Sequence, residues 1–227
     1  MATTKKNEVI TIKPIEVKTV DVEIEGQTPL IEHAWDEKAK RMILDAEQNK
    51  KKGKGHDYKN PVIDFINSLY WLEGKPEITE EMKEDEAACE QAFMQAIANG
   101  ARFGFPVKGL KDSAVSAAYR AGWTKDKVSA RGAFFVKGVT TDMIEIEGLP
   151  KMREDMVRVG MGSADIRYRG EFETWSAKFT LEYDANGQYS LESILNMINA
   201  GGRYCGIGEM RPEKGGQNGM FRIKASK

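Results

Sequence analysis

The chain has few of the residues from which metal sites, disulfide frameworks and nucleophilic active sites are built. Its 227 residues include two cysteines, Cys89 and Cys205, and two histidines, His33 and His56. The cysteines are far apart and lack the paired spacing of a zinc site, so both are predicted to be reduced thiols. No motif places a histidine beside Ser or Cys. The sequence therefore predicts no metal, no cofactor and no assignable catalytic residue.

Long hydrophobic runs and a net charge of one sign are also missing. No stretch approaches 18 consecutive apolar residues, and the first ten residues lack the apolar core of a secretion signal. These absences predict a cytoplasmic protein without a membrane partner. Because the formal net charge is −1, a nucleic-acid site would depend on local placement of cations.

What is present is a regular series of amphipathic segments that predicts an α+β fold. After a polar arm at residues 1–16, one domain is expected over 17–227, with a mostly helical insertion at about 36–100 and a hairpin arm at about 151–170. Without insertion and arm, the order is β-α-β-β-α-β, the ferredoxin-like plan. Strands are predicted at 17–25, 131–138, 142–148, 171–183 and 220–223, with 131–138 and 142–148 paired together. Helices are predicted at 35–48, 61–69, 79–99, 110–121 and 191–200, the third capped by Thr79 and the last ended by Gly201 and Gly202.

The segment from Gly201 to Gly219 is the first candidate site. It matches neither the phosphate-loop pattern nor the dinucleotide-binding pattern, because the required Lys-Ser/Thr pair and the third glycine are missing. What remains is a glycine-rich loop bearing Arg203, Arg211 and Lys214. Glycine lets backbone amides approach an anion, and arginine presents a planar fork to phosphate. A plain hairpin with glycines at its turns is an equal alternative.

Two further basic segments are candidates for single-strand binding. In the hairpin arm, arginines alternate with methionines and Tyr168, a mixture that suits unpaired bases and phosphates. Acidic residues dilute this charge, and the alternative is an ordinary solvated hairpin whose arginines pair with those acids, Glu154, Asp155 and Asp165. The loop 49–60 is interpreted first as solvated chain and second as a mobile phosphate-neutralising arm. The candidate residues are Arg153, Arg158, Arg167 and Arg169 in the arm, and Lys50, Lys51, Lys52 and Lys54 in the loop.

Three segments in this order resemble the RAMP superfamily, the repeat-associated subunits of CRISPR effector complexes. The strand and turn VDVEIEGQTPLIEHAW (20–35) is similar to the first strand of that family. The segment FPVKGLKDSAVSAAYR (105–120) resembles its helix start, with Asp112 where glycine is usual, and CGIGEMRPEKGGQNGMF (205–221) resembles its glycine-rich loop. Residues 36–100 do not match. The sequence also resembles proteins encoded by phages or other mobile elements.

The resemblance implies binding of single-stranded RNA or DNA by subunits that stack along the strand. We therefore predict a non-catalytic, multimerising single-strand binder. One alternative is a ribonuclease of the same fold that uses His33 or Asp36. Another is a phage protein that binds a host or phage protein as an inhibitor or structural component, which the acidic segment 79–99 favours. The residues carried over are Gly206, Gly208, Gly215, Gly216 and Gly219 as loop glycines, and Lys111, Arg120, Arg203, Arg211 and Lys214 as backbone contacts.

Overall fold

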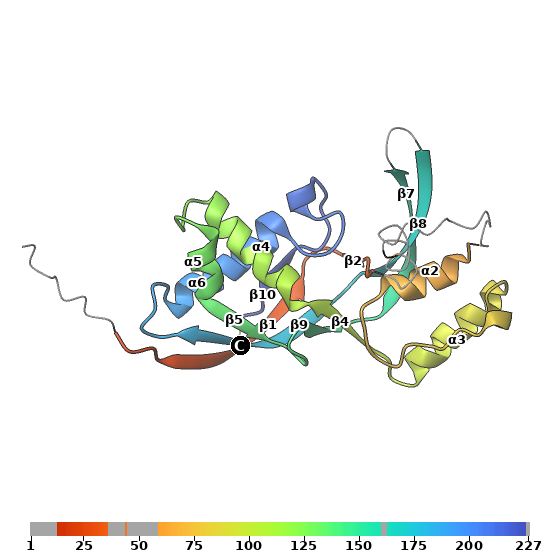
Figure 1. Ribbon diagram of the computed structural model, residues 1–227, viewed down its shortest axis with the longest axis horizontal. Helices are drawn as coiled ribbons and strands as arrows, with labels where there is room; N and C mark the ends of the chain where they lie inside the picture. Colours follow the sequence, from red (N-terminus) through yellow and green to blue (C-terminus); the bar gives the residue numbers. More distant parts are fainter. Residues whose placement is uncertain (1–12, 36–43, 45–58, 160–162, 226–227) are drawn as a thin grey trace, which may run out of the picture.

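The computed structural model describes residues 13–35, 44, 59–159 and 163–225, and it confirms the α+β class. Two antiparallel sheets lie along an elongated molecule, with helices on one face of the larger sheet (Figure 1). The predicted helix 35–48 lies outside the described residues, apart from Trp35 and Leu44. So do the four candidate lysines of the loop 49–60, Lys50, Lys51, Lys52 and Lys54.

The larger sheet has the strand order β10-β1-β9-β6-β4-β3, and β5 also pairs with β9. All of these pairings are antiparallel. Apolar residues alternate along β1 and β9, so one face of the sheet is buried and the other is polar. The strands are β1 (Val17–Gly26), β3 (Trp71–Glu73), β4 (Arg102–Pro106), β5 (Phe134–Lys137), β6 (Met143–Glu147), β9 (Ser176–Asp184) and β10 (Phe221–Ile223).

The predicted pairing of strands 131–138 and 142–148 with each other is wrong. Both pair with β9 instead, β5 through Val136 opposite Leu181 and β6 through Ile146 opposite Ala177. The two strands therefore occupy successive lengths of the same edge of β9. Local alternation cannot distinguish this arrangement from a hairpin, because both bury the same side chains.

The smaller sheet has the order β2-β8-β7 and carries a long hairpin. It consists of β2 (Leu30–Glu32), β7 (Pro150–Val159) and β8 (Ser163–Phe172), and the hairpin projects away from the larger sheet (Figure 1). The single strand predicted over 171–183 is wrong, since Phe172 ends β8 and Ser176 begins β9 in the other sheet. The chain changes sheets across these three intervening residues.

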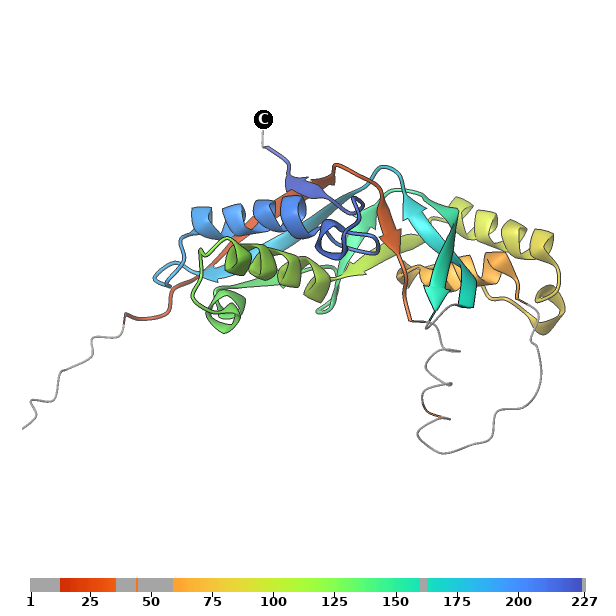
Figure 2. The same ribbon diagram turned by 90° about the horizontal axis from the view of Figure 1, so that it is seen from above.

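Helices α4 (Val107–Arg120), α5 (Lys127–Gly132) and α6 (Leu191–Ala200) cover the apolar face of the larger sheet (Figures 1 and 2). The core between them contains Ile24, Leu181, Leu110 and Ile194, all at most 1% exposed. Ser190 caps α6, as predicted, because its side chain accepts from the amide of Ser193.

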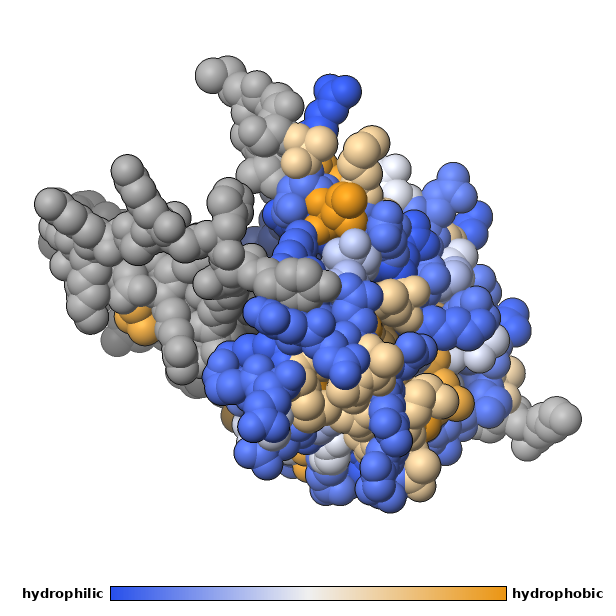
Figure 3. Space-filling model, turned by 90° about the vertical axis from the view of Figure 1, so that its right-hand side faces the viewer, coloured by the Kyte–Doolittle hydropathy of each residue, from blue (hydrophilic) through white to orange (hydrophobic). Residues whose placement is uncertain are grey.

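The other end of the molecule carries α2 (Pro61–Ser68) and α3 (Glu86–Ala98). Hydrophilic and moderately hydrophobic side chains intermingle on the surface at this end (Figure 3). The predicted helix 79–99 is wrong in its first part: a 3-10 turn occupies Glu80–Met82, and Asp85 rather than Thr79 caps α3 through the amide of Ala88. No described helix is long and apolar enough to cross a membrane.

The α-helical part of α6 ends at Ala200, as predicted, but Gly201 and Gly202 do not end the helical path. The chain continues through a π-helical turn, Gly201–Cys205, before it leaves the helix at Gly206. A Cβ atom at position 201 would lie 2.6 Å from the amide nitrogen of Ala114 in α4, so glycine is needed there for close helix packing. These two glycines therefore serve packing of the helix rather than its termination.

Candidate nucleic-acid interface

The polar face of the larger sheet is occupied by ion pairs. Cations and carboxylates alternate across neighbouring strands, and each cation is neutralised locally. Exposed phosphate-binding sites need cations in excess of carboxylates, so this face is a poor candidate. The pairs are Arg102 with Glu145, Lys137 with Glu182, Lys178 with Glu147, Arg222 with Glu25, and Lys224 with Glu23.

The glycine-rich loop lies on the opposite, helix-bearing side, beside β2 and α4 (Figures 1 and 2). Two of its amides bind β2 and the turn before it: Glu209 donates to the carbonyl of Ile31 at 2.9 Å, and Gly219 donates to that of Pro29 at 2.7 Å. The loop thereby joins the two sheets. A Cβ atom at Gly208 would lie 2.5 Å from the carbonyl oxygen of Ile31. Glycine is therefore needed at this position, because the two backbones approach too closely for a side chain.

Most remaining amides of the loop are also used within the fold. Ile207 donates to Gly219, Asn218 to Met210, and Gly216 to Arg211. Gly206, Gly208, Gly215 and Gly219 have φ angles between 65° and 84°. The loop glycines therefore serve turns and tight internal packing first, and side chains are better placed than amides to meet a phosphate.

Four cationic side chains and the carboxylate of Glu213 make up this loop surface. Glu213 accepts from Arg120 at 2.9 Å and from Arg211 at 3.2 Å, so a single carboxylate serves two guanidiniums. Arg211 also donates to the carbonyl of Gly208 at 2.9 Å. Lys214 follows directly and is exposed, as is Arg203 at the start of the segment. The sequence-predicted Arg120, Arg203, Arg211 and Lys214 thus share one side of the molecule with an excess of positive charge.

A cleft of about 310 Å³ lies between this loop, the start of α4 and the end of β2. His33 and Tyr70 line it on the β2 side, and Lys108 and Arg211 line it on the other. His33, predicted as a site residue only in the ribonuclease alternative, is half-buried in this lining. Lys108 reaches Asp112 one turn along α4, at 2.5 Å.

Two of the hairpin arginines, Arg153 and Arg169, are bound to carboxylates, as the alternative interpretation of this segment expected. Asp155, which is 8% exposed, pairs with Arg153 at 2.9 Å and with the buried Arg169 at 3.2 Å. Arg153 also pairs with Glu171. These contacts make Arg169 part of the hairpin's interior and leave it 4.0 Å from Glu209 of the loop. Of the predicted hairpin contacts, Arg169 is the least accessible to a ligand.

The outer part of the hairpin holds the more accessible arginines. Arg158 is exposed near the hairpin tip, with no ion pair among the residues that the structure describes. Arg167 is 3.7 Å from Asp165 and is half-exposed. Residues 150–172 carry five Lys and Arg side chains against four carboxylates, so the hairpin contributes little net charge.

Lys111 lies apart from the loop surface. Its ammonium group lies 4.4 Å from the ring centre of Phe135 and 5.4 Å from that of Phe134. Burial lowers the pKa of Lys111, a shift that the neighbouring Asp112 opposes. The structure therefore does not bring Lys111 together with Arg203 and Lys214. The lysines of the loop 49–60 that are predicted to contact nucleic acid lie outside the described residues: Lys50, Lys51, Lys52 and Lys54.

Buried titratable groups support the fold beside the cleft. Glu32 is fully buried, and one of its oxygens accepts from the amide of Tyr70 at 3.0 Å. Burial raises the pKa of Glu32 well above its usual range. Burial also raises the pKa of the Cys205 thiol, as expected of an unreactive cysteine. No periodicity or motif in the sequence distinguishes Glu32 from the exposed carboxylates of β1.

Comparisons with known proteins assign neither a family nor an activity. No protein-family model matches the sequence, and no curated protein matches it. Among solved structures, the chain is similar to Cmr6 from Pyrococcus furiosus, with 10% identity, coverage of 93% of this chain and 100% of that chain, and a TM-score of 0.34. That score is too low for the likeness to decide the fold family or the function.

Proposed function

We propose that this protein binds single-stranded RNA or DNA through the helix-bearing side, along the glycine-rich loop and the hairpin. The observation that carries the proposal is the distribution of charge. Carboxylates neutralise the cations of the open sheet face, whereas at the loop Glu213 is shared by Arg120 and Arg211 while Arg203 and Lys214 are exposed. A single strand offers flexible phosphates that such a surface can neutralise.

We also propose that the core follows the ferredoxin-like plan, in keeping with the resemblance of three segments to the RAMP superfamily. In support, the order β10-β1-β9 followed by β5 and β6 is antiparallel throughout. Helix α4 lies between β1 and β5 in the chain, and α6 lies between β9 and β10. If β5 and β6, which lie on successive lengths of one edge of β9, are counted as one strand position, these elements follow β-α-β-β-α-β once the segments 30–106 and 150–172 are set aside.

Binding is tested by titrating a labelled single strand of about 30 nucleotides at 50 and 200 mM salt, a range over which phosphate contacts weaken measurably. With three or four phosphate contacts, we expect the affinity to fall about 20- to 50-fold between these salt concentrations. The variant Arg203→Gln/Lys214→Gln should weaken binding and flatten the salt dependence. Absence of binding even at the lower salt would reject the function.

The matched control is Lys178→Gln/Arg222→Gln, which removes the same number of cations from the open sheet face. Both residues are exposed and ion-paired there. If they contribute only to the charge of the sheet, the affinity and the salt slope stay close to those of the unmodified protein. An equal loss in both double variants would mean that binding follows total charge rather than the loop surface.

Assembly along the strand is part of the proposal. The larger sheet ends at β10 and β3. On β10 the outward amide of Ile223 already donates to Asn199 of α6, so β3 offers the outer edge for pairing with a further copy. The mass in solution is measured with strands of increasing length, together with the absorbance ratio at 260 and 280 nm of the purified protein. Assembly predicts a protein number that rises with strand length, and one copy on every strand would exclude it.

A ribonuclease is the second candidate, favoured by the position of His33 in the cleft beside Tyr70 and Lys108. Asp36, the other predicted catalytic residue, lies outside the described residues. The test is incubation of a labelled RNA with the protein, with and without divalent metal, in parallel with His33→Ala. RNA that stays intact in every sample would exclude cleavage, and cleavage lost only in His33→Ala would support it.

A further inference from the structure

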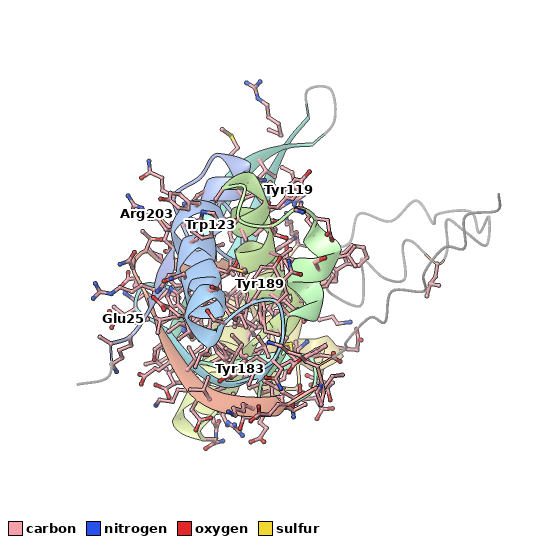
Figure 4. The ribbon with its side chains drawn as sticks, turned by 90° about the vertical axis from the view of Figure 1, so that its left-hand side faces the viewer. Glu25, Tyr119, Trp123, Tyr183, Tyr189 and Arg203 are labelled. Atoms are coloured by element: carbon pink, nitrogen blue, oxygen red, sulfur yellow. The ribbon has the colours of Figure 1, made fainter. Side chains whose placement is uncertain are left out.

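A second hollow, of about 590 Å³, lies beyond the glycine-rich loop on the outer side of α6. Its lining includes Trp123, Tyr189 and Asn196, together with Arg203 and Tyr204 from the π-helical turn. Trp123, Tyr189 and Arg203 are labelled around α4 and α6 in Figure 4; Trp123 follows α4 and Tyr189 precedes α6, whereas Arg203 follows the C-terminal end of α6. The volume falls within the range typical of small-ligand sites, about 300–1,000 Å³.

The fold holds these side chains at the surface by backbone geometry. Gly122, with φ of 72°, ends α4, and the amide of Trp123 then donates to the carbonyl of Ala118 at 3.0 Å. On the other side, the π-helical turn widens the end of α6 and presents Arg203 and Tyr204 outward. Such turns interrupt α-helices frequently at functional sites.

The exposure of the aromatic rings is unusual for residues of this size. Trp123 is 52% exposed and Tyr204 is 64% exposed. The hydroxyl of Tyr189 is bound to Thr124 at 2.8 Å, which fixes that ring within the lining. Two large rings at the rim of a hollow offer stacking faces, and stacking suits any planar aromatic ligand.

The polar groups of the lining narrow the class of ligand. Arg203 has no ion pair among the described residues, and the described lining contains no carboxylate. The side-chain oxygen of Asn199 already accepts a hydrogen bond from the backbone amide of Ile223. Asn196, by contrast, is exposed beside the rings. The lining therefore offers a guanidinium, a side-chain amide and aromatic faces, and its described residues include no carboxylate that would repel a phosphate. This combination suits a nucleobase that carries a phosphate.

We infer that this hollow binds one unpaired nucleobase of the single strand, stacked on Tyr204, with Asn196 at its edge and Arg203 at the adjacent phosphate. The inference rests on the proposed function, because Arg203 belongs to both the hollow and the glycine-rich segment. It adds a base contact to a surface otherwise described by phosphate contacts. Recognition there is tolerant of sequence, since every base has a stacking face.

The test compares two labelled strands of equal length, one with normal bases and one with an abasic backbone, for the full chain and for Tyr204→Ala. Loss of one base–aromatic contact should raise the Kd of the normal strand about 5- to 150-fold. The abasic strand should bind both proteins equally. Tyr204→Phe, which keeps the ring, should bind the normal strand as the unmodified protein does.

The outcomes separate this inference from the proposed function. If the unmodified protein binds the normal strand and Tyr204→Ala leaves that Kd unchanged, the hollow takes no base while single-strand binding stands. If the unmodified protein binds neither strand, the proposed function fails and the base site fails with it. Self-association that Tyr204→Ala abolishes, with no change in strand binding, would assign the hollow to a second copy and overturn the inference.

Discussion

Arg120 at the end of α4 donates a hydrogen bond to Glu213 of the glycine-rich loop at 2.9 Å, across 93 positions of the chain. The same carboxylate also receives Arg211. The pairing attaches the loop to the helix layer, and it also holds two guanidiniums away from any other anion. Glu213 is therefore both a structural contact and a competitor for phosphate.

Glu213→Gln should strengthen single-strand binding. The change leaves a neutral amide between Arg120 and Arg211, so both guanidiniums can turn to phosphates. We expect a tighter Kd at low salt and a steeper salt dependence, by about 0.7 in log–log slope for each added phosphate contact. The measurement is a salt titration of binding to a labelled single strand.

The control for Glu213→Gln is Glu182→Gln, which removes a carboxylate paired with Lys137 on the open sheet face. It changes the net charge by the same amount and should leave the salt slope unaltered. Equal strengthening by the two variants would show a general effect of charge. Weakened binding by Glu213→Gln would show that the loop needs this carboxylate for its shape.

The ion pair between Arg120 and Glu213 is a kind of contact that the sequence alone does not predict. Alternation along residues 17–25 and the Ser190 cap before residues 191–200 act within a few positions, and β1 and α6 were predictable from them. The partners of an arginine depend on which distant carboxylate the fold brings near. For that reason Arg153, Arg169 and Arg211 could be proposed as phosphate contacts from sequence. Pairing of the hairpin arginines with nearby acids was the alternative there, whereas the contact of Arg211 and Arg120 with one carboxylate could not be foreseen.

The missed elements have a similar physical reason. β2 is three residues long and is defined by its pairing with β8, so it has too few positions to show a period. The π-helical turn at Gly201–Cys205 forms because two glycines allow close contact with Ala114 and Phe221, although glycine ordinarily ends a helix. Trp123 and Tyr204 are distant in sequence, and only this geometry makes them neighbours in one lining.

Arg169→Met should destabilise the protein through the buried partner that it leaves behind. Arg169 is 3% exposed and donates to Asp155 at 3.2 Å. Removing one member of a buried ion pair costs about 3–5 kcal/mol, and the remaining contact of Asp155 with Arg153 should place the loss near the lower value. Urea unfolding gives the change in free energy.

Arg167→Met serves as the matched control for Arg169→Met, because Arg167 is half-exposed and 3.7 Å from Asp165. Exposed pairs contribute about 0–1 kcal/mol, so this variant should unfold almost as the unmodified protein does. The double variant Asp155→Asn/Arg169→Met should recover part of the loss. Equal stability of Arg167→Met and Arg169→Met would contradict the structural role of Arg169.

Stability should fall as the pH rises above about 4.5 because of Glu32. Burial raises the pKa of this carboxyl in the folded protein, so the folded state binds more protons than the unfolded state between the two pKa values. In that window the free energy of unfolding decreases with pH, by at most about 1.4 kcal/mol per unit. Glu32→Gln cannot ionise and should lack this decrease, as measured by urea unfolding at several pH values.

For Glu32→Gln, the exposed Glu81 supplies a control, since Glu81→Gln removes a carboxylate from the 3-10 turn surface. Its pH profile should follow that of the unmodified protein. Retention of the full pH dependence in Glu32→Gln would assign the effect to other groups. Loss of folding in Glu32→Gln at acidic pH, where the neutral carboxyl and the amide are close substitutes, would also contradict the explanation.

Two loop glycines, Gly215 and Gly219, can be ranked against Gly132 of α5 by a series of alanine substitutions. At Gly132 a Cβ atom meets nothing within 4 Å, and no positive φ opposes it. At Gly215 the space is open but φ is +84°, whereas at Gly219 φ is +67° and a Cβ atom would lie 1.7 Å from the carbonyl oxygen of Ile207. The expected losses on substitution by alanine are close to zero at Gly132, about 1–2 kcal/mol at Gly215, and larger than both at Gly219.

This series also separates the two explanations of the glycine-rich loop. If its glycines serve turns and packing, the loss of stability in urea unfolding follows the order Gly132, Gly215, Gly219, and Gly215→Ala binds a single strand as the unmodified protein does. If Gly215 instead lets the backbone approach a phosphate, Gly215→Ala loses affinity beyond what its stability explains. Since the amide of Gly215 already donates to the carbonyl of Pro212 at 3.0 Å, we expect the first result.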